Sequence, residues 1–312
     1  MTRAKEELYL SAAYDYGGKT VRKVSQFVVE ALELATPAPP AKKSTATELI
    51  QRSRTAQPLP LTAMVPTQRV LRVDPHGVDD YLTCPLKYRY SHVLRLPVMQ
   101  HHLVVYGAAL HKAIEQFFKR QLQGRPLAEA EVLGAFEGAW RSEGFLTREH
   151  EALRLEQGRQ TLRRFVARQR AQPEHPTLIE AKFQFLLEDV HVVWRWYRID
   201  VRGDDVVIID YKSSEMRDQA SADRRTRESL QMLVYALGWA VLHEQPPTRI
   251  ELHFIESDLI GRQVVTEDAM DRAKTLIREA TQGIRSLDFH AMPQEFSCRW
   301  CAFQAICPFA FQ

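Results

Sequence analysis

The sequence predicts an α/β fold in which a mixed sheet is flanked by helices. Apolar residues recur at helical spacing over residues 104–122, and residues 148–172 form a second, strongly basic helical segment. Strands and helices are then expected in the order Thr177–Leu187, Val190–Val201, Asp205–Lys212 (strands), Arg227–Leu242 (helix), Arg249–Glu256 (strand) and a final helix from Thr266. A set of consecutive strands followed by a helix and a further strand is typical of a mixed sheet covered by helices.

The amino-terminal part differs in composition from the rest of the chain. Residues 1–34 contain a strand-like run, Glu7–Ser11, and a helical pattern, Lys23–Leu34. Residues 35–69 contain prolines at positions 37, 39, 40, 58, 60 and 66 among Ala, Ser, Thr and Lys. Such a segment cannot bury enough apolar surface to offset its ordering entropy, so we expect a flexible linker. The globular pattern covers residues 70–312.

Composition bounds the class of protein. The 312 residues are 45% hydrophobic and 26% charged, which suits one good-sized domain with appendages. The apolar runs are too short to span a bilayer, and the first residues do not have the pattern of a signal peptide. We therefore expect a cytoplasmic protein without a membrane partner. The net charge of +3 does not by itself indicate nucleic acid.

One stretch, Cys84–Arg125, is locally basic. It holds seven Lys and Arg residues against a single acid, Glu115, with histidines and aromatic residues among them. Such interleaving fits a surface that follows a phosphate backbone, although a solvated helix face has the same composition. The predicted contacts to single-stranded or forked DNA are Lys87, Arg89, Arg95 and Arg120.

The four cysteines form one candidate metal-ligating set. Cys84 stands alone in the sequence LTCPLKY, and Cys298, Cys301 and Cys307 follow the pattern C-x2-C-x5-C near the end. Thiolates in this number can hold an iron–sulfur cluster, and zinc accepts the same ligands. Zinc sites usually combine two CxxC pairs, and disulfides are rare in cytosolic chains. Buried structural thiols are the remaining alternative.

This arrangement resembles the iron–sulfur subset of RecB-like PD-(D/E)XK nucleases, which includes AddB-type and helicase-fused members. The resemblance covers about Leu71 to the carboxyl terminus. It implies a restriction-endonuclease-like fold and a [4Fe–4S] cluster held by Cys84, Cys298, Cys301 and Cys307. Such a cluster would tie the segment near Cys84 to the carboxyl terminus.

Three further motifs carry the resemblance. GAALH, ending at His111, is similar to the family's GxxxH helix; IIDYK contains Asp210 and Lys212 of the DYK core; QMLVY runs from Gln231 to Tyr235 and is similar to QxxxY. The resemblance implies that His111 and Asp210 hold Mg²⁺ or Mn²⁺ and that Lys212 orients water or stabilises charge. It also implies that Gln231 and Tyr235 approach the DNA. The spacings agree, because each pair shares one face of its strand or helix.

The strand before Asp210 departs from the family pattern. WRWYRID matches a GxxDRxD pattern except that Trp194 replaces the glycine and Tyr197 replaces a metal-binding aspartate. If the connecting turn has two residues, Tyr197 stands opposite Asp210 and Asp200 points to the other side of the sheet. A neutral tyrosine is a poor ligand for a hard cation, so we expect an impaired metal site. Glu180, on the neighbouring strand, is a candidate replacement.

The first residues resemble a helicase. TRAKEELYL, residues 2–10, is similar to motif VI of UvrD/Rep-type superfamily 1 helicases, in which Arg3 would reach the γ-phosphate of ATP. The chain has no Gly-x4-Gly-Lys-Ser/Thr loop, so it is not an ATPase on its own. The resemblance implies that residues 1–34 are a remnant of a helicase motor domain and that the motor is fused or a separate partner. Met1 would then be internal to a longer protein, or the gene has been split.

These observations favour a DNA-binding, exonuclease-like module of a helicase–nuclease in DNA repair and recombination, with an impaired nuclease site. Two alternatives stay open: an active Mg²⁺- or Mn²⁺-dependent DNA nuclease, and a protein-docking platform in a repair complex. Tyr197 distinguishes an impaired from an active nuclease, and the basic stretch Cys84–Arg125 favours DNA binding over protein docking.

Overall fold

The computed structural model describes residues 24–33 and 70–311. The chain divides into two units, residues 1–63 and 64–312. Within the first unit, helix α1 (Gln26–Ala31) lies inside the predicted helical region. The predicted strand Glu7–Ser11, the helicase-like segment and the predicted linker lie outside the described residues.

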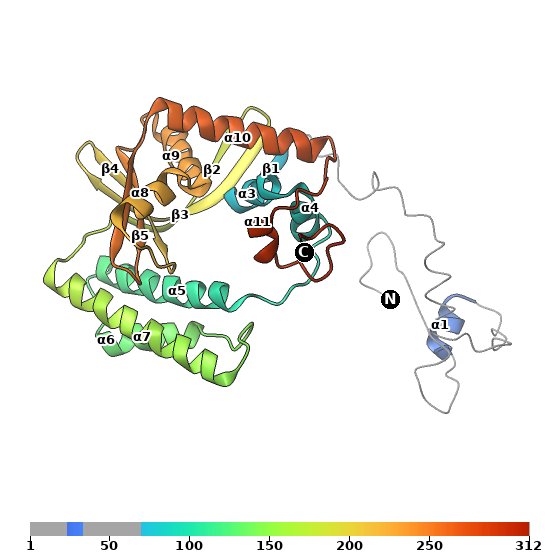
Figure 1. Ribbon diagram of the computed structural model, residues 1–312, viewed down its shortest axis with the longest axis horizontal. Coiled ribbons are helices and arrows are strands. Elements are labelled where there is room, and N and C mark those ends of the chain that lie inside the picture. The colour runs from blue at the N-terminus through green and yellow to red at the C-terminus, as the bar shows by residue number, and fades with distance from the viewer. Residues whose placement is uncertain (1–23, 34–69, 312) are drawn as a thin grey trace. The chain divides into compact units, whose positions relative to one another are not determined.

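The second unit contains a six-stranded mixed sheet with helices on both faces, as the sequence predicts (Figure 1). Its strands are β1 (Leu71–Val73), β2 (Leu178–Leu187), β3 (Val190–Arg202), β4 (Asp205–Lys212), β5 (Arg249–Phe254) and β6 (Leu259–Val264). The order is β1-β3-β4-β5-β6, and β2 pairs with β3 on the other side. Strands β2, β3 and β4 are antiparallel neighbours, whereas β5 runs parallel to β4 and β1 parallel to β3.

Helices cover the sheet in two layers. The described helices of this unit are α3 (Pro75–Thr83), α4 (Pro85–Tyr88), the π-helical turn η2 (Arg89–Val93), α5 (His102–Leu122), α6 (Glu129–Ala139), α7 (Arg148–Ala171), α8 (Gln219–Arg227), α9 (Leu230–His243), α10 (Glu267–Arg285) and α11 (Glu295–Arg299). One apolar core lies between the sheet and α5, α6 and α7; the other joins the sheet to α3, α9 and α10. Figure 1 shows these two layers on opposite sides of the strands. Among the described helices, none combines the length and apolarity that crossing a bilayer requires.

Side-chain caps fix the starts of the helices that carry the site and the core. Thr147 accepts a hydrogen bond from the His150 N–H at the start of α7, and Thr266 caps α10 in the same way. Ser229 caps α9 and thereby separates it from α8. The single helix predicted over Arg227–Leu242 is therefore wrong at its start, because the chain breaks at this cap.

The predicted register of β3 and β4 is confirmed. Gly203 has a positive φ of 59° in a two-residue turn, which allows Arg202 to pair with Asp205. Pairing continues along the strands to Arg198 opposite Ile209. Tyr197 is the next residue, on the side of Asp210.

The side chains of β2 change the face of the sheet to which they point at Glu180, where β2 pairs with β3. Ile179 packs in the core beneath α5, whereas Ala181, two residues later, packs in the core beneath α9. Residues two apart normally share a face, so the strand turns over at Glu180, whose φ is +54°. The pairs on either side place Glu180 opposite Tyr197. Left-handed backbone in a non-glycine residue marks strain, and such irregularities in strands cluster at functional sites.

Candidate active site and cysteine pocket

Six residues from α5, β3, β4 and α9 form what we call the active-site cluster: His111, Tyr197, Asp210, Lys212, Gln231 and Tyr235. The Nζ of Lys212 lies 2.7 Å from Oδ2 of Asp210 and donates to Oε1 of Gln231 at 2.8 Å. Nε2 of Gln231 donates to the hydroxyl of Tyr235 at 2.6 Å. The predicted motif residues are therefore neighbours in space, although their segments are far apart in the sequence.

The direction of each hydrogen bond in the active-site cluster follows from the groups themselves. Lysine only donates, so the Gln231 carbonyl oxygen faces Lys212 and the amide nitrogen faces Tyr235. The indole N–H of Trp194 also only donates, and it reaches the same Tyr235 hydroxyl at 2.8 Å. Trp194 thus holds Tyr235 from β3. The sequence shows that Trp194 stands in place of a glycine, but it does not show that Tyr235 is the hydrogen-bond partner of Trp194.

The environment of the Asp210 carboxylate favours a cationic partner. Its side chain is fully buried, and neither carboxylate oxygen accepts a hydrogen bond from the described residues. The contact with Lys212 has the distance of an ion pair but not the angles of a hydrogen bond. A buried carboxylate without hydrogen bonds is rare in proteins. The chemistry of this group fits a metal ion as well as an ammonium.

His111 faces Asp210 from α5. Its ring centroid lies 4.6 Å from that of Tyr197. Some of the side chain remains exposed, yet protein atoms surround it densely, and this desolvation lowers the pKa of His111. The Asp210 carboxylate and the Tyr211 carbonyl act in the opposite direction and are outweighed. His111 is therefore neutral near pH 7, the form in which imidazole ligates metals.

Tyr197 brings no charge to the active-site cluster. Burial, with the nearby carboxylates of Asp210 and Glu180, raises the pKa of Tyr197 to about 12. Glu180 itself pairs with Arg195 at 3.0 Å. In residues 24–33 and 70–311, no three His, Cys, Asp or Glu side chains are arranged to hold one metal ion. The donor set thus has His111 and Asp210 but lacks a third side-chain ligand.

Asp200 lies on the opposite side of the sheet, as its register predicts. Its carboxylate accepts two hydrogen bonds from Arg198, at 2.8 and 2.5 Å. The same guanidinium donates to the Tyr211 hydroxyl at 2.9 Å and pairs with Glu174. This buried network holds Asp200 away from the active-site cluster.

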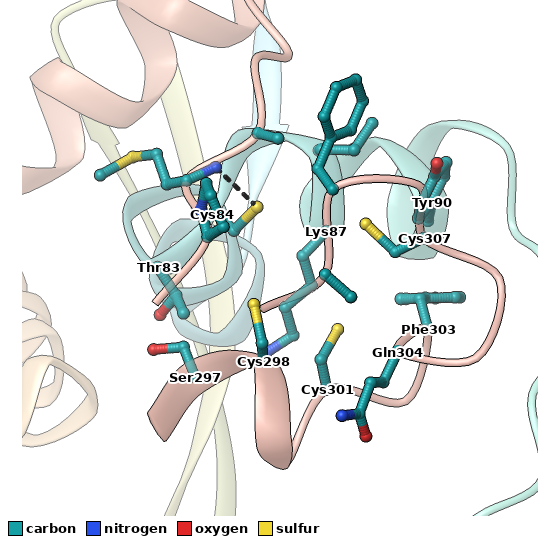
Figure 2. Close-up of a pocket in the computed structure, with 16 residues that line it drawn as sticks. Thr83, Cys84, Lys87, Tyr90, Ser297, Cys298, Cys301, Phe303, Gln304 and Cys307 are labelled. Carbon is teal, nitrogen blue, oxygen red and sulfur yellow. Dashed lines mark hydrogen bonds between the residues drawn. The ribbon is translucent and has the colours of Figure 1, made fainter. Parts of the chain in front are cut away.

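The four cysteines line one pocket, the cysteine pocket, and all four are free thiols (Figure 2). The Met292 N–H donates to Cys84 Sγ at 3.4 Å, and the Phe303 N–H lies near the Cys301 thiol. Burial raises the pKa of the Cys301 thiol, while the Phe303 N–H and the Lys87 ammonium lower it. Donors of this kind stabilise thiolates that ligate a metal centre.

Distant parts of the chain meet at the cysteine pocket through ordinary hydrogen bonds as well. The Leu86 N–H donates to the His290 carbonyl at 3.1 Å, and the Tyr81 hydroxyl donates to the Asp288 carbonyl at 2.7 Å. The segment around Cys84 therefore packs against the segment that leads into α11.

The four predicted DNA contacts lie on separate elements. Lys87 belongs to α4, lines the cysteine pocket and pairs with Asp80 at 2.6 Å. Arg89 is half-buried in η2, whereas Arg95, just beyond it, is exposed. Arg120 is exposed near the end of α5. Of the four, only Arg95 and Arg120 are exposed.

Comparison with known proteins gives one match by sequence family. The model of the PD-(D/E)XK nuclease superfamily matches residues 73–308, which include the active-site cluster and all four cysteines. No curated protein matches the chain. The solved structure of SSO0001 aligns at 12% identity over 86% of this chain and 99% of its own, with a TM-score of 0.39. A protein of Eubacterium rectale, provisionally described as an exonuclease, aligns at 9% identity over 80% of this chain and 90% of its own, with a TM-score of 0.47.

Proposed function

Because the chain belongs to the PD-(D/E)XK nuclease superfamily, we propose that it is a DNA-binding module of a helicase–nuclease whose catalytic site lacks one metal carboxylate. The observation that carries this proposal is Tyr197. Tyr197 and Asp210 are the next residues of β3 and β4 beyond the Arg198–Ile209 pair, so they are neighbours. The phenol of Tyr197 stays neutral at physiological pH. A hard divalent cation prefers carboxylate oxygens to a neutral phenol.

The remaining residues of the active-site cluster fit part of a metal site. The buried Asp210 carboxylate and the neutral His111 imidazole would hold a divalent cation, which when bound polarises a phosphate and activates water. Lys212 would steady negative charge on a DNA phosphate, since Gln231 holds its ammonium in place at 2.8 Å. With one carboxylate missing, these groups bind DNA better than they cleave it.

A cleavage assay tests the proposal. The full chain is incubated with single-stranded DNA and Mg²⁺ or Mn²⁺, as wild type, Tyr197→Asp, and the matched control Tyr197→Phe. We expect little cleavage by wild type and Tyr197→Phe and a gain of about ten-fold or more in Tyr197→Asp, because a ligand is restored. Adding Lys212→Ala to Tyr197→Asp should remove the gain. Robust cleavage by the wild type would contradict the proposal.

One observation favours the alternative of an active nuclease. Glu180 is held in a left-handed conformation opposite Tyr197, and its side chain is largely buried. Were this carboxylate to replace the missing aspartate, wild-type cleavage would be strong and would disappear in Glu180→Gln. The pairing of Glu180 with Arg195 speaks against that role.

We also infer that Cys84, Cys298, Cys301 and Cys307 hold a [4Fe–4S] cluster. Support comes from the shared cysteine pocket and the backbone N–H groups at sulfur. The described cysteines are not grouped for one ion, and a cluster of several atoms separates its ligands more widely than zinc does. The cluster would strengthen the contact between the Cys84 segment and the end of the chain.

Chemical analysis tests the cluster. Protein purified without oxygen should be brown and contain iron and sulfide near four each per chain, about the content of one cluster. Cys301→Ser should lose the colour and make the carboxyl-terminal segment more sensitive to protease. Stoichiometric zinc without sulfide would contradict the cluster.

The helicase link and the repair role rest on the sequence TRAKEELYL, residues 2–10. We propose a UvrD/Rep-type motor, fused or separate, as the partner, and the cytoplasm as the compartment, where thiols stay reduced. The test is the genomic sequence upstream of Met1, together with co-purification of a helicase with the full chain. A gene without upstream helicase sequence, and a chain that purifies without a helicase, would contradict this part.

A further inference from the structure

A groove of about 760 Å³ lies between α5 and α6. Three residues of its lining, Lys112, Gln116 and Arg120, are spaced four apart on α5, so they share one face of that helix. With a rise of about 1.5 Å per residue, neighbouring members of this row are about 6 Å apart along the axis. One wall of the groove is therefore a regular row of cationic and amide side chains.

The groove has an excess of cationic groups. Arg120 and Arg141 are exposed, and neither forms an ion pair with the described part of the chain. Lys112 pairs with Glu115 at 3.1 Å and keeps 46% of its side chain exposed. The acid in the lining, Glu131, already accepts a backbone N–H at the start of α6 at 2.8 Å. The charge of the groove is complementary to a polyanion.

The row of side chains begins next to His111 of the active-site cluster. Lys112 directly follows His111, whose ring lies 4.6 Å from that of Tyr197. Arg120 lies eight residues after Lys112, about 12 Å further along the axis of α5. Because consecutive residues of a helix point in different directions, phosphates bound along this row would pass beside His111 on a neighbouring face of α5.

We propose that the groove between α5 and α6 binds single-stranded DNA, with Lys112, Gln116 and Arg120 contacting successive phosphates. This inference rests on the proposed DNA-binding function and adds the path of the strand. The lining also includes the aromatic ring of Trp140, on which an unpaired base can stack. Since the bases of a duplex are already stacked on one another, this lining favours a single strand.

Matched charge removal tests the groove. Lys112→Gln/Arg120→Gln/Arg141→Gln removes three positive charges from it, and Lys274→Gln/Arg278→Gln/Arg285→Gln removes three from the exposed side of α10. Affinity of the full chain for fluorescent oligo(dT) is measured by anisotropy over a range of salt concentrations. The groove variant should bind about ten-fold or more weakly than wild type, with a salt slope lower by about two units, since each lost phosphate contact to a single strand contributes about 0.7.

The outcomes separate this inference from the proposed function. If wild type fails to bind oligo(dT), both are overturned. If wild type binds and the two triple variants lose affinity equally, or the groove variant binds normally, only the groove inference is overturned. A photo-crosslinking residue at Gln116 should attach to the oligonucleotide, whereas one at Gln282 on α10 should not. A groove that takes a peptide instead would leave the Gln116 crosslink at background.

Discussion

At the scale of single residues, Trp194, which stands where the family pattern has a glycine, supports the side chains of the active-site cluster. Its indole N–H holds the Tyr235 hydroxyl, and Tyr235 in turn accepts from Gln231, which orients Lys212. Its ring also packs edge-on against His76 at 5.0 Å. A glycine at this position would leave Tyr235 with one donor fewer and a gap beside His76.

A pair of tryptophan variants isolates this role. Trp194→Phe removes the donor to the Tyr235 hydroxyl, and Trp196→Phe removes an indole donor to the Tyr235 carbonyl at 3.1 Å. Each should lower the free energy of unfolding by about 1–2 kcal/mol, the usual cost of such a lost bond. Only Trp194→Phe should shift the side-chain amide resonances of Gln231 in NMR spectra. Equal shifts in both variants would mean that Trp194 has no positioning role.

His111 should make stability depend on pH. Desolvation lowers its pKa in the folded state, while in the unfolded chain the pKa is near the ordinary value of about 6.5. As the pH falls below that value, the unfolded chain takes up a proton that the folded chain refuses, so the free energy of unfolding decreases. Asp210, Lys212 and Arg195 also act on this imidazole.

The measurement is chemical denaturation of wild type and His111→Gln at pH 8 and pH 5.5. Wild type should lose more stability between these two pH values than His111→Gln does, because the variant has no imidazole to protonate there. The same loss in both proteins would show that other groups cause the pH dependence.

At the scale of elements, the sequence predicts those segments that have a clear period or run. The helices near residues 104–122 and 148–172 and strands β2 to β5 are found where the pattern puts them. Helix α8 was missed because its sequence, QASADRRTR, has no apolar stripe. Helix α8 packs closely against β6 at Gly261, where a Cβ would overlap the Ala222 carbonyl. A close contact of this kind leaves no periodic pattern in the sequence.

A second close approach joins α10 to α3. A Cβ on Gly283 would overlap the Tyr81 hydroxyl, which donates to the Asp288 carbonyl. Gly283→Ala should therefore lower the free energy of unfolding by about 1–3 kcal/mol, despite the better helix propensity of alanine. The control is Gly134→Ala in α6, whose Cβ would meet no atom within 4 Å. It should leave stability unchanged or raise it by up to about 1 kcal/mol. Stabilisation by both changes, measured by urea denaturation, would contradict this packing.

At the scale of the whole nuclease-fold unit, the active-site cluster and the cysteine pocket could be predicted because each motif residue has a fixed place on a strand or helix. The register of β3 and β4 followed from a two-residue turn, so the neighbourhood of Tyr197 and Asp210 could be foreseen. The rotation of β2 at Glu180 could not be foreseen, because it depends on how Ile179 and Ala181 pack into two different cores. The place of Lys87 in the cysteine pocket likewise depends on the packing of α4 against the carboxyl-terminal segment.

The central claim is that the active-site cluster lacks a metal carboxylate at Tyr197, and the binding of Mn²⁺ tests it most directly. Mn²⁺ is titrated by electron paramagnetic resonance into anaerobically purified wild type, Tyr197→Asp and Tyr197→Asp/Asp210→Asn. Wild type should bind weakly, and Tyr197→Asp should bind about ten-fold or more tightly, a gain of about 1.4 kcal/mol that the double variant loses. Wild type that binds Mn²⁺ as tightly as Tyr197→Asp, and loses it in Glu180→Gln, would contradict the account.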